Sequence, residues 1–384
     1  MNAAGYFDYN ATTPLDPRVF AEMLPFFNDR FANPSSAYRQ ACDVLGAVEN
    51  ARKRVAGLVN ADPSEILFTS GGTESDNLAL FGAARRYKNI GRHLITSAVE
   101  HEALLAPCRQ LQKEGFVLTV LPVDQDGLVD PDDLRRAIRK DTILISIMQA
   151  NNETGVIQPV RELAALARAH GVAFHTDAVQ ALGKIPVNIA ELGVDLLSLS
   201  THKIYGPKGT GALYVKHDVA LVPLLFGGGQ EKKRRAGTEN VAGIVGLGKA
   251  AELCREEIAA EAQRLGEWRD RLQNEIGECI PETRVNGDTP QRLANTLNVS
   301  FRGCDGGVLV AFLDGSGLAL SSGSACSAKS RSPSHVLLAM GRSEGEAVEG
   351  LRISLGRFSS KQDLEKLLRE LSQAVRRLRA EPNL

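Results

Sequence analysis

The sequence contains no pair of cysteines at C-x-x-C spacing, and its cysteines and histidines do not have the spacing of a zinc site. Its six cysteines are instead scattered along the chain. This distribution argues against a disulfide framework and against a structural metal ion, and it favours a reducing compartment. We therefore expect no metal site built from protein ligands alone.

Long apolar runs and an excess of charge are also missing. No apolar stretch reaches the roughly 18 residues of a membrane-spanning helix, and the N-terminus has no basic region followed by an apolar run. The formal net charge is -1, which gives no electrostatic reason to expect binding to nucleic acid or to an anionic membrane. We expect a cytoplasmic protein with neither partner.

What the chain does contain is a repeated strand and helix pattern. Its 384 residues exceed the length that one hydrophobic core usually supports. Short apolar runs without polar alternation are separated by helical segments, which predicts an α/β fold with a mostly parallel sheet covered by helices on both faces. The expected strands are 65–70, 93–97, 116–122, 142–150, 171–178 and 195–200.

The pattern changes near Val241, where glycines precede a long charged helix expected at about 250–279. Short strands and helices follow to the C-terminus. We predict a large α/β domain over 17–250 and a smaller α+β domain formed by 1–16 and 251–384.

Two helices are expected near the N-terminus, after an extended arm. The first covers 18–27, and the second covers 37–59. The loop 33–36, with the sequence Asn-Pro-Ser-Ser, is expected to supply the N-cap of the second helix.

Polar residues follow several of the expected strands. In parallel sheets, ligands bind at the carboxyl ends of the strands. Gly72 and Thr73 open a helix and could bind an anion, although a plain glycine turn is an alternative. His101 and Asn152 could equally be capping or turn residues. Asp177 is more informative, because a carboxylate at a buried strand end is unfavourable unless it meets a cation.

The segment 195–215 places a lysine on a turn between two apolar strands. Lys203 there is either a structural lysine in an ion pair or an amine held for covalent chemistry. Asp177 favours the second interpretation. Together the strand-end residues suit pyridoxal 5'-phosphate (PLP): Lys203 would form the Schiff base, and Asp177 would keep the pyridine nitrogen protonated. The remaining polar groups at this edge are Gly72, Thr73, His101, Asn152, Gln180, Ser200 and His202.

Seven motifs in this order resemble those of the cysteine desulfurases of the NifS/IscS type, in the class V aminotransferase family. They are FTSGGTESDNLAL, SAVEH, ANNETGVIQP, FHTDAVQALGKIPV, LSLSTHKIYGPKGTGALYV, RRAGTEN and SSGSACS. The resemblance covers nearly the whole chain. It implies PLP fold type I, as in aspartate aminotransferase, and a homodimer. It also implies conversion of L-cysteine to L-alanine and an enzyme persulfide, with the sulfur passed to an acceptor such as an iron-sulfur scaffold protein.

The resemblance also implies roles for individual residues. His101 would stack on the cofactor ring and assist proton transfer, and Asn152 and Gln180 would contact the ring oxygen and the substrate side. Thr238 would reach the phosphate of the cofactor in the neighbouring subunit. The phosphate of the subunit's own cofactor would be held by Gly72, Thr73, Ser200 and His202.

Cys326 lies among small and polar residues, which predicts an exposed loop on which a thiolate can attack the substrate sulfur. It is the expected persulfide carrier and a possible iron-sulfur cluster ligand. Arg352 alternates with apolar residues on a probable strand and is expected to bind the substrate carboxylate, an edge-strand arginine being the alternative. Buried, unreactive thiols are expected for the other cysteines, Cys42, Cys108, Cys254, Cys279 and Cys304.

Other activities are compatible with these residues. A selenocysteine lyase or a cystine C-S lyase would share the PLP site, and a sulfur carrier or scaffold could retain the fold without the chemistry. Glu102 and Tyr38 depart from the family pattern, in which an uncharged residue and a histidine are usual. The sequence ends at Leu384, short of the extension that docks a scaffold protein in longer members, so the acceptor stays open.

Overall fold

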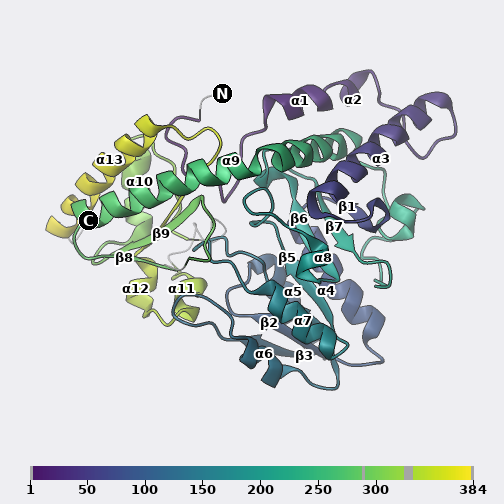
Figure 1. The fold of residues 1–384 in the computed structure, drawn as a ribbon, viewed down its shortest axis with the longest axis horizontal. Coiled ribbons are helices and arrows are strands. Elements are labelled where there is room, and N and C mark those ends of the chain that lie inside the picture. Colours follow the sequence, from purple (N-terminus) through teal and green to yellow (C-terminus); the bar gives the residue numbers. More distant parts are fainter. Residues whose placement is uncertain (1–2, 288–289, 324–331, 382–384) are drawn as a thin grey trace.

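The computed structural model describes residues 3–287, 290–323 and 332–381. Its larger sheet comprises β1 (Ile66–Thr69), β2 (His93–Ser97), β3 (Val117–Leu121), β4 (Thr142–Ser146), β5 (Ala173–Asp177), β6 (Leu196–Ser200) and β7 (Gly211–Val215). The strand order is β1-β7-β6-β5-β4-β2-β3 (Figure 1). Strands β3, β2, β4, β5 and β6 form parallel pairs, whereas β7 is antiparallel to β6 and β1. The predicted mostly parallel α/β sheet is confirmed.

Helices cover both faces of this sheet. Successive strand residues point to opposite faces, and the neighbours Leu196 and Leu197 of β6 lie in different cores. The core around Leu197 includes residues of α3 (Arg39–Val59), α7 (Val160–Ala169) and α9 (Val241–Cys279). The core around Leu196 includes residues of α4 (Gly72–Tyr87) and α5 (Glu102–Lys113). Burial on both sides explains why the central strands lack polar alternation.

The N-terminal helices differ from the prediction in two places. The segment expected as one helix forms α1 (Pro17–Met23) and α2 (Pro25–Asn28), because Pro25 has no N–H to donate to the preceding turn. Helix α3 begins after Tyr38, which makes no side-chain cap hydrogen bond. The N-cap predicted within 33–36 is therefore wrong. The Asn33 side chain instead accepts from the Ser35 N–H inside the loop, at 2.9 Å.

Helix α9 begins at Val241, earlier than the predicted start near residue 250. The Asn240 side chain caps it by accepting from the Gly243 N–H at 3.1 Å. Glycines in this first part weaken the helical signal of the sequence. A Cβ on Gly248 would lie 2.6 Å from the Ala51 Cα of α3, so glycine permits the close approach of the two helices.

A second, antiparallel sheet has the order β10-β9-β8 and is formed by β8 (Thr283–Val285), β9 (Thr296–Phe301) and β10 (Gly350–Ser354). Helices α10 (Gly306–Gly315) and α13 (Lys361–Ala380) pack against it in a separate core. Phe7 of the N-terminal arm is buried in that core, and Asp8 forms a bridge with Ser354. The remaining short helices are α6 (Pro131–Ala137), α8 (Ile189–Leu192), α11 (His335–Ala339) and α12 (Glu344–Val348).

Helix α9 runs along both parts of the molecule (Figure 1). Its buried residues Ile244, Leu247 and Cys254 belong to the core of the large sheet, and Leu265, Leu272 and Ile276 belong to the core of the small sheet. The predicted domain boundary at 250/251 stays a prediction. Within the described ranges, no helix combines the length and apolar character needed to cross a membrane.

Candidate active site

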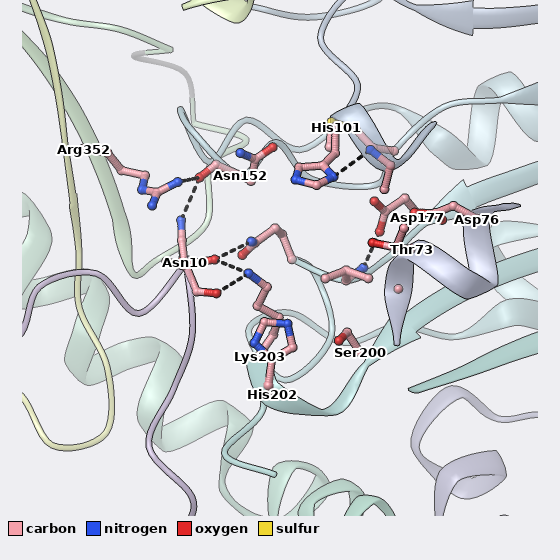
Figure 2. Close-up of a pocket in the computed structure, with 16 residues that line it drawn as sticks. Asn10, Thr73, Asp76, His101, Asn152, Asp177, Ser200, His202, Lys203 and Arg352 are labelled. Atoms are coloured by element: carbon pink, nitrogen blue, oxygen red, sulfur yellow. Dashed lines mark hydrogen bonds between the residues drawn. The ribbon is translucent and has the colours of Figure 1, made fainter. Parts of the chain in front are cut away.

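A pocket of about 250 Å³ lies at the carboxyl ends of the parallel strands, where α4 begins and the N-terminal arm passes (Figure 2). Most of the residues predicted from strand ends line it, and β10 contributes Arg352. The pocket-lining residues from the prediction are Gly72, Thr73, His101, Asn152, Asp177, Gln180, Ser200, His202, Lys203 and Arg352. The sequence therefore identified residues from separate segments that meet in one cavity.

The first turn of α4 forms one end of the pocket. Backbone N–H groups at the start of a helix have no carbonyl partner within it, and they favour an anion. Gly72 is required here because a Cβ would lie 2.8 Å from Cγ2 of Val179. Thr73, Ser200 and His202 add polar side chains to the lining. Burial lowers the pKa of His202 to about 4, with a further contribution from Lys203.

Asp177 is the last residue of β5 and is buried. Its Oδ1 accepts from the Val179 N–H at 2.8 Å. Burial raises the pKa of Asp177 to about 6, although this hydrogen bond and Lys203 act in the opposite direction. Among the described residues no cation forms an ion pair with this carboxylate. A ligand that carries a protonated nitrogen would supply one.

A second buried carboxylate, Asp76 of α4, also lines the pocket. Its Oδ1 lies 3.7 Å from Nε2 of His175 and has no hydrogen-bond partner in the described part of the chain. Burial and the neighbouring Asp177 raise the pKa of Asp76 well above its ordinary value. Burial also lowers the pKa of His175 to about 3, so this imidazole is neutral.

His101 lies above the pocket in the view of Figure 2, and Lys203 lies below it. His101 is the N-cap of α5, and its Nδ1 accepts from the Ala103 N–H at 3.0 Å. This bond leaves Nε2 to carry the proton of the neutral ring. Burial, followed by the charge of Lys203, lowers the pKa of His101.

Lys203 lies in a 3₁₀ turn, Thr201–Lys203, directly after β6. Its Nζ donates to the backbone carbonyls of Asn10 and Ala11, both at 2.6 Å. His202 is held against the same arm through an Nδ1 contact with Thr12 Oγ1 at 3.1 Å. The N-terminal arm therefore forms one wall of the site.

Arg352 of β10 is only 1% exposed. Its Nη2 lies 2.6 Å from Asp8 Oδ1, and its Nη1 donates to the Asn152 carbonyl at 3.1 Å. Its buried Nε has no hydrogen-bond partner among the described residues. A guanidinium that faces a pocket with one N–H unused is suited to bind a carboxylate. The alternative of an ordinary edge-strand arginine does not fit this burial.

One described residue predicted for the site does not line the pocket. Thr238 lies on an exposed segment before α9. Cys326 lies outside the described residues. Of the other cysteines, Cys108, Cys254 and Cys304 are buried, and burial raises the pKa of the first two to about 12. The expectation of buried thiols is wrong for Cys42 and Cys279, which are exposed on the surfaces of α3 and α9.

Sequence reasoning missed several pocket residues, notably Asn10, Ala11, Asp76 and Met148. Asn10 lies in an arm without a recognisable motif, and its partners are distant in sequence. Asp76 is inside a helix, where an acidic residue is usually exposed. Only its position on the buried side of α4, next to apolar residues, could have indicated it. No cluster of three or more potential metal ligands occurs within the described ranges.

Comparison with known proteins gives consistent matches. A family model described as Aminotransferase class-V matches residues 5–367. Cysteine desulfurase IscS of Dictyoglomus turgidum is 50% identical over 379 residues, which cover 99% of this chain and 96% of that protein. The protein of the same name from Methanosarcina thermophila is 49% identical over 379 residues, which cover 98% of this chain and 93% of that protein.

Solved structures give the same result. A NifS-like protein superposes with a TM-score of 0.92 at 37% identity, covering 98% of this chain and all (100%) of that chain. A structure described as SspA in complex with cysteine has a TM-score of 0.83 at 40% identity. That match covers 93% of this chain and 100% of the other.

Proposed function

Because this chain belongs to the aminotransferase class-V family, we propose that it is a PLP-dependent cysteine desulfurase of fold type I. It converts L-cysteine to L-alanine and leaves the sulfur as a persulfide on Cys326. The observation that carries the proposal is the pairing of a pocket amine, Lys203, with a buried carboxylate, Asp177, that has no described cationic partner.

The pocket residues fit PLP. Lys203 would hold PLP as a Schiff base until the substrate amine takes its place, and PLP would then supply an electron sink for the carbon next to the substrate nitrogen. Asp177 would hold a proton on the pyridine nitrogen, and His101 would pack against the ring. Asn152 and Gln180 would contact the ring oxygen and the substrate side. The first turn of α4, with Gly72, Thr73, Ser200 and His202, would hold the phosphate.

The protein's own groups then handle the substrate. Arg352 binds the α-carboxylate, with Nε and an Nη as the donors. Lys203 Nζ removes the proton from the α-carbon, and His101 assists proton transfer. The Cys326 thiolate attacks the substrate sulfur, so that an S–S bond forms and the C–S bond breaks. The electron pair of that bond stays with the carbon fragment, which takes up a proton at Cβ, regains the α-proton from Lys203 and becomes alanine.

We further propose that the enzyme is a cytoplasmic homodimer in which Thr238 of one copy reaches the phosphate in the other. Its exposed position on the segment before α9 supports this role. The sulfur acceptor is an iron-sulfur scaffold protein, in keeping with IscS as the name of the relatives. In that setting Cys326 is also a possible ligand of a nascent cluster, whose iron is cargo and not a resident cofactor.

The test is mass spectrometry of the Cys326 peptide after incubation of the purified enzyme with L-cysteine. The wild type should gain one sulfur atom on Cys326 and release alanine. Cys326→Ala should keep the yellow cofactor and lose persulfide, whereas Lys203→Ala should not bind PLP covalently. Cys279→Ala removes an exposed thiol on α9 and should behave as the wild type. Native sulfide release by Cys326→Ala without added thiol would contradict the role of Cys326.

The same assay separates the alternatives. A selenocysteine lyase would turn over L-selenocysteine and leave Cys326 unmodified with L-cysteine. A carrier or scaffold would show no visible cofactor band after addition of PLP. Candidate acceptors added one at a time should remove the sulfur from Cys326 only when the acceptor is the physiological one.

A further inference from the structure

Lys184, which follows β5, is a second amine beside the pocket and was not among the predicted site residues. Its Nζ donates to Oε1 of Gln180 at 2.5 Å and to Oδ1 of Asn10 at 2.9 Å. No carboxylate among the described residues forms an ion pair with it. Burial lowers the pKa of Lys184 well below its ordinary value, and the charges of Lys203 and Arg352 act in the same direction. Burying an amine is unfavourable unless its N–H groups are hydrogen-bonded, and the two hydrogen bonds of Lys184 meet this condition.

These contacts fix the orientation of the Gln180 side chain. Lys184 Nζ donates to the amide atom that faces it, so that atom must be the oxygen. At the other end of the amide, Nε2 donates to the Asn10 backbone carbonyl at 2.9 Å, and a carbonyl only accepts. A rotation of the amide by half a turn would place oxygen against oxygen at one end and N–H against N–H at the other.

Asn10 is fixed in the same way, which makes the arrangement rigid. Its Oδ1 accepts from Lys184 and from Asn295 Nδ2, the latter at 3.1 Å. Its Nδ2 donates to the Asn152 carbonyl at 3.2 Å and to Thr296 Oγ1 at 2.9 Å. Gln180 therefore hydrogen-bonds at both ends to groups that are themselves held in place. One N–H of Nε2 is used by Asn10, and the other is left for the pocket that Gln180 lines.

We propose that Lys184 is a positioning residue, which holds the Gln180 amide with an N–H directed to the ring oxygen of the bound cofactor. The inference rests on the proposed function. Without Lys184 only the Asn10 backbone carbonyl opposes a turn of the amide that would bring its oxygen to the pocket. The ring oxygen of the bound cofactor also shares a proton within the cofactor. An N–H donor from the protein competes with that proton for the oxygen. The donor therefore favours the form of the cofactor that has lost the shared proton.

The consequence is measurable as the pH midpoint of the visible absorbance change of the holoenzyme. Lys184→Met should raise this midpoint by about 1 pH unit, the size expected for a lost hydrogen bond to a charged group. Gln180→Ala should raise it to a similar extent. Because Lys184 acts through Gln180, adding Lys184→Met to Gln180→Ala should give no further shift. Lys113→Met, an exposed lysine at the end of α5, is the matched control and should leave the midpoint unchanged.

Further variants and measurements separate a positioning role from a structural one. Lys184→Arg retains donors and should keep the wild-type midpoint. If Lys184→Met does not fold, Lys184→Gln serves instead, since its shorter side chain cannot reach Oε1 of Gln180 in the same way and should give the same rise. An unchanged midpoint in the folded variant, or a shift that persists in the Gln180→Ala background, would overturn the inference alone. Absence of any visible band in the wild type after addition of PLP would overturn it together with the proposed function.

Discussion

Asp177 is held where ionisation is unfavourable, which gives the protein without cofactor a characteristic pH dependence. Its pKa is about 6 in the folded chain, against an ordinary value of 3.8. The folded state therefore keeps a proton that the unfolded state has lost between those values. Stability falls as the pH rises through this window, by up to about 3 kcal/mol.

In the protein without PLP, Asp177→Asn should abolish this loss of stability at higher pH. We expect the variant to be more stable than the wild type at about pH 7 and close to it at about pH 4. Urea unfolding of both proteins at the two pH values measures the difference, with the wild type as the reference. The difference includes the smaller rise in the pKa of Asp76 once the neighbouring Asp177 charge is removed. If the unfolding free energies of the two proteins changed by the same amount between the two pH values, Asp177 would not be the group responsible for the pH dependence. With PLP bound, the order should reverse, since only the carboxylate pairs with the ring nitrogen.

Arg352 allows a second test at this scale. Arg352→Lys keeps the charge but cannot present two parallel N–H donors to a carboxylate. The KM for L-cysteine should rise about 10- to 100-fold, while the visible band of the cofactor stays unchanged. Arg284→Lys, an exposed arginine on β8, is the control. A change in kcat with constant KM would place Arg352 outside carboxylate binding.

At the scale of elements, the contact between α3 and α9 depends on the absence of a side chain. A Cβ on Gly248 would meet Ala51 Cα at 2.6 Å, whereas a Cβ on Gly277 of the same helix would meet nothing within 4 Å. Gly248→Ala should destabilise the protein by about 1–3 kcal/mol because it forces the helices apart. Gly277→Ala should stabilise it by up to about 1 kcal/mol through helix propensity. Thermal unfolding of the two variants provides the comparison, and equal effects would contradict the packing argument.

The elements also show what the sequence could predict. Strands such as β4 and β6 were identified because burial on both faces produces apolar runs that depend only on local sequence. The same parallel arrangement brought His101, Asp177 and Lys203 to one edge, so their proximity followed from the fold class. The start of α9 was missed because its glycines serve contacts with another helix, and local propensity does not report such contacts.

The rest of the site required long-range information. Asn10 and Lys184 acquire their roles from partners that approach only in the folded chain. Asn10 belongs to no motif, and Lys184 lies in the motif FHTDAVQALGKIPV without a chemistry that the sequence alone indicates. The capping prediction at 33–36 failed for a related reason. A serine or an asparagine can cap a helix or close its own turn, and the sequence alone does not separate these outcomes.

At the scale of the whole molecule, Arg357 connects the C-terminal part to α9 and to the N-terminal segment. Its guanidinium lies 2.5 Å from Asp16, 2.7 Å from Glu257 and 3.3 Å from Glu261. Although burial opposes ionisation, hydrogen bonds from Arg18 and Arg357 lower the pKa of Asp16 to about 2. This contribution to stability is present above about pH 4 and is lost as the pH falls towards 2.

Arg357→Met should destabilise the protein by about 3–5 kcal/mol near pH 7, because it leaves partly buried carboxylates without this partner. The effect should shrink as the pH falls below about 4, where the carboxylates become protonated. Denaturant unfolding at both pH values is the measurement. Arg302→Met, which removes an exposed ion pair with Glu282, should change stability by less than about 1 kcal/mol. A pH-independent loss in Arg357→Met would assign the effect to packing.

The N-terminal arm has a consequence for the order in which the enzyme matures in the cell. Asn10 and Ala11 are synthesised long before Arg352, yet they line the same pocket. At translation rates of about 5–20 residues per second, roughly 20–70 s separate the synthesis of the two walls. Until the ribosome has passed Arg352, Lys203 lacks the complete cavity around it. Cofactor capture in the complete cavity must therefore follow the synthesis of β10.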